Sequence, residues 1–215
     1  MTYTTREYQG RVNGIMGGPF LVVDGMMGPK TRAAIQEAMK IKGVRYAKDL
    51  FTRGVRGIVW HWTAGAHGII QLERDHYNFL FDRDGNEWDG NHTIQEQVNY
   101  DWRQGVGASH TKSMNTGWIG LSVDAMAGAV ESPLNWGSNP LTWEGIDAML
   151  MKTMDLCKEY DIPVSPWTTL SHAEVQQTLG IRQRFKWDYK VLPGYTRAVD
   201  ARKVGDIMRD RMVNL

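Results

Sequence analysis

Apolar side chains recur at helical spacing in about the first 45 residues. Tyr8, Val12 and Ile15 share one face of a predicted helix, and a second helix is predicted to begin near Pro29. Proline is favoured at the first helical position, where its missing N–H costs nothing. The glycine-rich segment VDGMMGPKT, residues 23–31, forms a turn between them. This pattern predicts a small helical unit that closes on itself.

The pattern changes after this unit. Residues 41–56 are basic and polar with two glycines, which predicts a linker. GIVWHWTAG at 57–65 and WIGLSVDAM at 118–126 are β-rich apolar runs, typical of buried strands. YNFLFDRDGNEWDG at 77–90 has an Asp-Gly pair at its centre and predicts a β-hairpin. A sheet is therefore expected after the linker.

Helices are predicted between and after these strands. Thr142 can cap a long amphipathic helix that runs to about Tyr160, and residues 197–213 form a last helix. Strands mixed with helices, without regular βαβ repeats or a glycine-rich phosphate loop, favour an α/β fold over a dinucleotide-binding fold. We predict a small all-α domain at 1–46 and, at 47–215, a mixed central sheet flanked by helices.

Composition and charge exclude several classes of protein. With 25 Lys and Arg against 24 Asp and Glu, the chain lacks the positive surplus of a nucleic-acid-binding protein. No run of about 18 apolar residues occurs, so membrane insertion is not expected. The N-terminus lacks the apolar region of a signal peptide. The single cysteine, Cys157, lies at helical spacing with apolar residues and is predicted to pack in the core.

Three side chains form a candidate metal site. His61 lies near the end of the strand at 57–65, His172 follows a proline-containing loop, and Asp188 lies in FKWDYK. Two imidazoles and a carboxylate suit a catalytic Zn²⁺ that keeps a fourth position open for water. The three residues have no local metal-binding spacing, so a hydrogen-bonded histidine at a strand end remains an alternative for His61.

Five segments together carry a family resemblance. In order they are WHWTAG, YNFLFDRDGN, GASHTKSMNTGWIGLSV, HAEV and KWD, and they lie within residues 57–188. This series resembles the type 2 N-acetylmuramoyl-L-alanine amidases, a family that includes phage lysozyme-like amidases and is related to animal peptidoglycan recognition proteins. The resemblance implies zinc-dependent hydrolysis of the amide bond between the N-acetylmuramoyl lactyl group and L-alanine of peptidoglycan.

The resemblance also implies roles for individual residues. His61, His172 and Asp188 match the family's zinc ligands, with Asp188 at a position where some members have cysteine. Lys186 matches a lysine that stabilises the oxyanion, which is a large effect in a preorganised site. Tyr77 matches a tyrosine that helps to activate or orient water.

One departure from the family concerns proton transfer. Some members carry a catalytic glutamate at the position of Ser122. Serine cannot act as a carboxylate base. The expectation is therefore that zinc-bound water handles the proton, assisted by Tyr77, as in members with a hairpin tyrosine.

A second departure concerns the third ligand. The gap between His172 and Lys186 is longer than in the family, so the alignment of Asp188 is less direct than that of the histidines. Asp161 and Glu174 are alternative carboxylates. The retained Lys-x-Asp pairing favours Asp188.

Four further residues are candidates for substrate binding. His110 and Asn115 match the family's substrate groove, and we expect them near the glycan or stem peptide; loop hydrogen bonding is the alternative. Trp62 and Trp118, with Trp60, are candidates for the sugar site, although core packing is the alternative for all three.

The segment at 23–31 resembles the peptidoglycan-binding type 1 domain, a three-helix module, although a plain helical hairpin is the alternative. The resemblance implies that residues 1–46 anchor the protein to the cell wall. Together with the expected absence of a signal peptide, it resembles a phage endolysin, a monomer held in the host cytoplasm until it is released to the wall. A wall-recycling amidase and a non-catalytic peptidoglycan-recognition module are the alternatives, and the absence of H-E-x-x-H removes one group of zinc peptidases.

Overall fold

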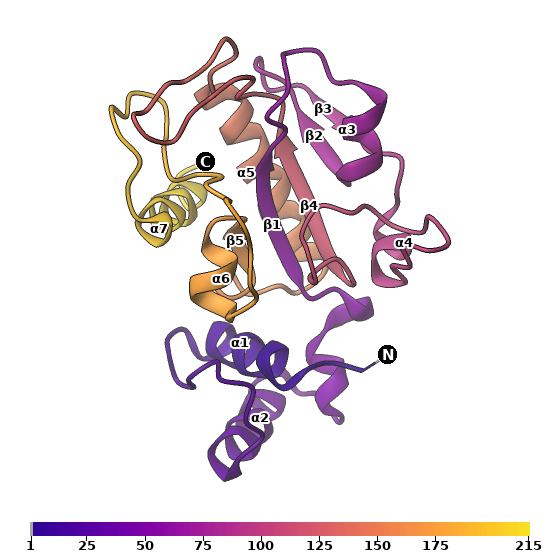
Figure 1. Cartoon of the computed structure of the whole chain (residues 1–215). Helices are drawn as coiled ribbons and strands as arrows, with labels where there is room; N and C mark the ends of the chain where they lie inside the picture. Colours follow the sequence, from indigo (N-terminus) through magenta and orange to yellow (C-terminus); the bar gives the residue numbers. More distant parts are fainter. Residues whose placement is uncertain (1) are drawn as a thin grey trace.

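A computed structural model describes residues 2–215 (Figure 1). The strands are β1 (Gly57–Trp62), β2 (Phe79–Phe81), β3 (Glu87–Asp89), β4 (Trp118–Val123) and β5 (Thr169–Ser171). The α-helices are α1 (Thr5–Met16), α2 (Pro29–Lys42), α3 (Gln71–His76), α4 (Ile94–Val98), α5 (Trp143–Glu159), α6 (Glu174–Leu179) and α7 (Ala201–Met212), and two 3₁₀ turns are η1 (Ala47–Leu50) and η2 (Thr52–Gly54). Within the described chain, no helix has the length and apolarity needed to span a bilayer.

The five strands form one mixed sheet in the order β3-β2-β4-β1-β5. β1 pairs in parallel with β4 and β5, and β2 pairs in parallel with β4. β2 and β3 form the predicted antiparallel hairpin, and Gly85 adopts the positive φ of 86° that its turn requires. The predicted α/β fold, a mixed central sheet flanked by helices, is confirmed.

Strand alternation separates a helix-covered face of the sheet from the face that carries His61. Ile58 and Trp60 of β1 belong to the apolar core shared with α5 and α7, and the Trp60 indole donates to the Thr153 hydroxyl of α5 at 2.9 Å. α5 accordingly runs behind the sheet in Figure 1. Val59 belongs to a separate apolar cluster, and His61 shares its side of the strand because side chains two residues apart point the same way.

The two predicted C-terminal helices are present, one with a different start. Thr142 caps α5 as expected, since its side chain accepts from the Gly145 N–H at 3.2 Å. The last helix was predicted over 197–213 but begins only after Asp200, whose side chain accepts from the Lys203 N–H and takes the N-cap position. This local hydrogen bond determines where the helix begins.

The N-terminal helices α1 and α2 have their own apolar cluster, which includes Val12 and Ile35. The predicted glycine-rich turn is held by the buried amide of Gln9. This amide donates to the Asp24 carboxylate at 2.7 Å and accepts from the Gly25 N–H at 2.9 Å. The sequence pattern therefore corresponds to a turn locked by one side chain.

The segment predicted as a linker, 41–56, is packed instead of loose. Leu50 and Phe51 are buried in the same cluster as the N-terminal helices. The buried guanidinium of Arg11 donates to the Val55 carbonyl at 2.8 Å, which joins α1 to the chain that enters β1. The linker prediction was wrong because the charged residues of the segment outnumber the apolar side chains that pack. A domain division after residue 46 stays a prediction.

A buried ion pair holds α6 and α7 to the edge strand β5. Arg209 donates to Glu174 at 2.7 Å and to the Thr169 carbonyl at 2.8 Å, and both charged side chains are buried. Glu174 also accepts from the Ser171 N–H at 2.8 Å. Because each charge has several partners, the pair fixes the position of the chain that follows β5.

We predict that Arg209→Met lowers the free energy of unfolding by about 3–5 kcal/mol, since it leaves the Glu174 carboxylate buried without its partner. Urea denaturation measures this loss. The matched control is Arg202→Met on the same helix, which removes a more exposed pair with Asp206 and should cost less than about 1 kcal/mol. Adding Glu174→Gln to Arg209→Met should recover most of the loss; equal losses for the two single variants would contradict the prediction.

Candidate metal centre

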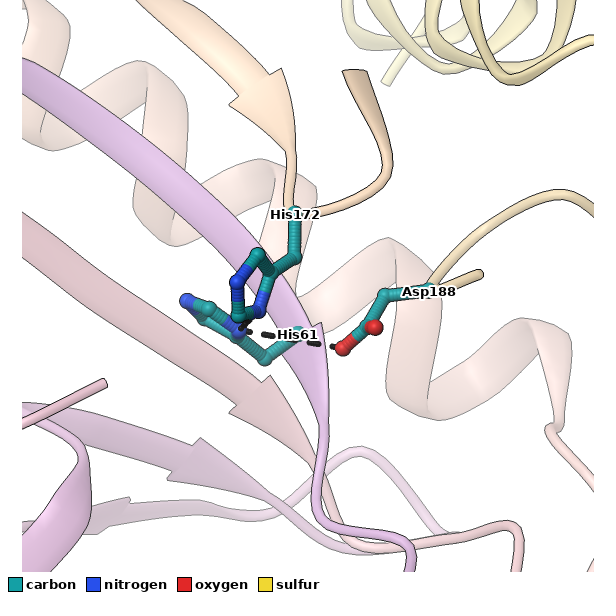
Figure 2. Close-up of side chains that lie close together, drawn as sticks. All are labelled: His61, His172 and Asp188. Carbon is teal, nitrogen blue, oxygen red and sulfur yellow. Dashed lines mark hydrogen bonds and ion pairs between the residues drawn. The ribbon is translucent and has the colours of Figure 1, made fainter. Parts of the chain in front are cut away.

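Strand topology brings the three predicted metal ligands together. His61 is the penultimate residue of β1, and His172 follows directly after β5, the parallel neighbour of β1. The His172 N–H donates to the Trp60 carbonyl at 3.0 Å, which continues the pairing beyond the strand. Asp188 comes from the loop between α6 and α7 and approaches the same point (Figure 2). The group thus lies at the carboxyl ends of parallel strands, where α/β sheets commonly bind ligands.

The donor atoms of His61, His172 and Asp188 all lie within 4.8 Å of one another. His61 Nδ1 is 3.1 Å from His172 Nδ1 and 3.7 Å from Asp188 Oδ1. The residues are only 1%, 2% and 6% exposed, respectively. Among residues 2–215, this is the one set of three such side chains with donor atoms so arranged. It could bind a metal ion.

His110 determines which nitrogen of His61 faces the group. His110 Nε2 lies 2.9 Å from the Trp118 carbonyl, which can only accept, so Nε2 carries the proton and Nδ1 of the neutral ring accepts. That Nδ1 is 3.1 Å from His61 Nε2. The Thr111 hydroxyl lies 2.9 Å from the same His110 nitrogen and 3.3 Å from His61 Nε2. With His61 donating through Nε2 to these acceptors, an unprotonated Nδ1 faces the metal site, the arrangement that outer hydrogen bonds impose on metal-ligating histidines.

Gln183 does the same for His172. Its Nε2 donates to the Lys112 carbonyl at 3.0 Å, which turns Oε1 toward His172 Nε2 at 3.1 Å. The amide oxygen accepts, so His172 Nε2 carries the proton and Nδ1 is free. Both imidazoles thus offer Nδ1 to the same space.

Burial keeps these imidazoles neutral. It lowers the pKa of His172 to about 4, lowers that of His61, and brings that of His110 well below its usual range. Burial alone would raise the pKa of Asp188, but the contacts with His61 and His172 and the charge of Lys186 bring it below its usual value. Neutral imidazoles beside a carboxylate are the protonation states that a metal ion requires.

Tyr77 and Lys186 lie close to the group. The Tyr77 ring centroid is 5.2 Å from that of His61. Burial, and then the charge of Asp188, raise the pKa of Tyr77, so its hydroxyl stays protonated. Lys186 is exposed, and its charge lowers the pKa of both His61 and Asp188. The site therefore has a hydroxyl donor and a cation beside the three candidate ligands.

His110 and Asn115, which were predicted near the substrate, form hydrogen bonds within the protein. His110 is buried against His61, and a Cβ at Gly120 would lie 2.5 Å from its ring. Glycine inside a strand often marks such a close approach, so Gly120 is the sequence signal from which this contact could have been predicted. Asn115 accepts from the Thr111 N–H at 2.8 Å, which is the loop hydrogen bonding considered as its alternative.

The two candidate sugar-site tryptophans are core residues in this structure. Trp62 is 5% exposed and Trp118 is 4% exposed, and each belongs to an apolar cluster. Little of either indole remains for contact with a sugar.

The alternative carboxylates have other partners. Asp161 forms an ion pair with Lys42, and Glu174 pairs with Arg209. Neither belongs to the His61–His172–Asp188 group. The geometry therefore favours Asp188 as the third candidate ligand.

Comparison with known proteins found two similar solved structures. One is the N-acetylmuramoyl-L-alanine amidase LysC from Clostridium intestinale URNW, with 13% identity, a TM-score of 0.43, and coverage of 77% of this chain and 90% of that one. The other is the endolysin N-acetylmuramoyl-L-alanine amidase LysCS from the same organism, with 14% identity, a TM-score of 0.42, and coverage of 77% and 88%. At these values the similarity does not define the activity of this chain. No family model and no curated protein matches it.

We predict that the metal-free protein loses stability as the pH falls from about 6.5 toward 4. The pKa of His172 is about 4 in the folded chain and 6.5 for an unperturbed histidine, so the unfolded state binds more protons in this interval. The stabilisation is fully present above pH 6.5 and decreases below it. Urea titrations at several pH values should show a shallower dependence for His172→Gln than for wild type; identical slopes would contradict this assignment.

We predict that His110→Ala weakens Zn²⁺ binding about 10- to 100-fold, because His61 loses the acceptor that orients its ring. Competition with a fluorescent chelator measures the affinity. His76→Gln is the control, since His76 is exposed and its ring hydrogen-bonds the Leu72 carbonyl of its own helix. An unchanged affinity in His110→Ala would show that His61 needs no such support.

Proposed function

We propose that this protein is a zinc-dependent N-acetylmuramoyl-L-alanine amidase that cleaves the bond between the lactyl group of muramic acid and the L-alanine of the stem peptide. The observation that carries the proposal is the convergence of His61, His172 and Asp188. These residues come from three distant segments and are the ones that the motif resemblance names as ligands. Their burial and unprotonated Nδ1 atoms add support that the sequence motifs alone did not provide.

The donor set fits zinc. Two imidazole nitrogens and one carboxylate oxygen are typical of catalytic zinc sites, which leave a further position for water or substrate. When bound, Zn²⁺ lowers the pKa of a water molecule and polarises the carbonyl that is attacked. His61, His172 and Asp188 would hold the ion.

Lys186 and Tyr77 have separate roles in the proposed reaction. The exposed ammonium of Lys186 stabilises the negative charge that develops on the carbonyl oxygen, as preorganised donors do in acyl transfer. Because the raised pKa of Tyr77 keeps its hydroxyl protonated, Tyr77 acts as a hydrogen-bond donor that orients water or substrate, and not as a base. Ser122, buried beside His61 in the sheet register, has no carboxylate to offer as a base.

The main rival is a non-catalytic peptidoglycan-recognition module. Such a protein has no need for a complete ligand set, whereas this chain has three candidate ligands with a neighbouring cation and hydroxyl. We favour an enzyme for this reason.

The biological role is also part of the proposal. The resemblance of the 23–31 turn to a wall-binding module favours a phage endolysin that stays in the host cytoplasm until it reaches the wall. A recycling amidase acts on soluble fragments and needs no such anchor.

We predict that the wild-type protein releases L-alanine amino termini from purified peptidoglycan without new reducing sugars. Removal of metal should abolish release, and added Zn²⁺ should restore it. Asp188→Ala should lower the rate at least about 100-fold and bind Zn²⁺ more weakly, because it removes the only carboxylate of the group.

Asp188→Cys is the matched control for this experiment, because a thiolate is also a good zinc ligand. It should retain metal and measurable amidase activity. Wall binding without amine release by any of these proteins would exclude the amidase and leave the recognition module.

A further inference from the structure

A polar hollow of about 760 Å³ opens beside the candidate metal group. Two of its lining residues are chain neighbours of the ligands: Ala173 follows His172, and Lys186 precedes Asp188 by two positions. The rest of the lining comes from the 131–134 turn, from α6 and from the chain that leads into α7. We call it the 186–201 hollow. Ala173 and Lys186 are the lining residues that link the hollow to the metal group along the chain.

Two cations of the 186–201 hollow have no ion-pair or hydrogen-bond partner among residues 2–215, whereas both of its anions have one. Glu131 forms an ion pair with Lys190, and Asp200 accepts from the Lys203 N–H at 3.2 Å. Lys186 and Arg197 line the same hollow, yet neither forms an ion pair or hydrogen bond with any of residues 2–215. The hollow therefore presents two positive groups without a direct partner.

The charge of this region differs from that of the whole chain. The protein carries a formal charge of +1, whereas the segment 182–197 contains five basic residues and one acidic residue, Asp188. Asp188 is buried and turned toward the metal group. The hollow itself is lined by three cations, Lys186, Lys190 and Arg197, and by two anions, Glu131 and Asp200, so its net charge is positive. A positive recess concentrates ligands of negative charge. An anion is thus the complementary occupant.

We propose that the 186–201 hollow binds a carboxylate of the peptidoglycan stem peptide and that Arg197 is its main contact. The inference rests on the proposed function. In the amidase reaction, the stem peptide begins at the scissile bond and therefore lies next to the metal group. The lactyl carboxyl of the glycan is consumed in that bond, so free carboxylates belong to the peptide. A guanidinium binds a carboxylate through two parallel hydrogen bonds, which suits Arg197 to this contact.

Lys186 and Lys190 have supporting positions in this arrangement. Lys186 lines the hollow, and its charge also lowers the pKa of Asp188, so it can contact both the reacting amide and the peptide that continues from it. Lys190 neutralises Glu131, which prevents that carboxylate from repelling the ligand. The hollow therefore selects for free carboxylates over their amides, and the amidation state of the stem peptide determines how well a wall is recognised.

The test measures binding of the released peptide, so it does not depend on catalysis. Two synthetic stem peptides that begin with L-alanine are compared, one with free carboxylates and one with the same carboxylates amidated. Calorimetry with the full-length protein at low salt should show about tenfold tighter binding of the acidic peptide. Arg197→Gln should reduce this preference about three- to tenfold. Arg184→Gln removes a charge from the same segment outside the hollow and should retain it.

Each outcome has a defined meaning. Equal binding of both peptides by wild type, binding of neither, or an unchanged preference in Arg197→Gln overturns the inference. An equal loss in Arg184→Gln also overturns it, since it indicates a diffuse charge effect. Binding of glycerol phosphate in place of the peptide would assign the hollow to a phosphate polymer.

The same experiment separates the inference from the proposed function. A charge-dependent preference for the peptide in a protein that cleaves no peptidoglycan would keep the binding site and remove the amidase. Cleavage with no such preference would keep the amidase and remove the binding site.

Discussion

Parallel pairing of β1 with β5 is the constraint on which the candidate site depends. Because both strands end at the same edge of the sheet, two histidines separated by more than a hundred residues bring their Nδ1 atoms to 3.1 Å. Side-chain alternation along β1 then places Trp60 in the core below α5 and His61 on the other face. Asp188 completes the group from a loop that is held near β5 by the Glu174–Arg209 pair and the start of α7.

Each of the two histidines has a hydrogen-bond partner on the side of its ring that faces away from the metal site. His110 and Gln183 each accept a hydrogen bond from one imidazole, and each donates in turn to a carbonyl of the chain. Such contacts set the tautomer and the ring orientation before any metal binds. Because His172 is buried in its neutral form, the folded state loses stability at low pH, where the unfolded chain binds a proton at this residue more readily.

The charged groups around the site face two different regions. The buried carboxylate of Asp188 faces the imidazoles, while Lys186 and Arg197 face the neighbouring hollow. A near-neutral chain can in this way present a local positive recess. In the proposed amidase, that recess would bind the stem peptide while the metal group acts on the amide.

Local order was readable from the sequence: β1, the β2–β3 hairpin, β4, the Thr142 cap and the start of α2 at Pro29 follow from periodicity and turn chemistry. The three candidate ligands followed from motif order. Only the tertiary structure decided the strand order, the packing of 41–56, the burial of Trp62 and Trp118, the contact of His110 with His61 and the hollow at Arg197. The physical reason is that periodicity reports which face of an element is apolar, whereas these features depend on which distant elements that face meets.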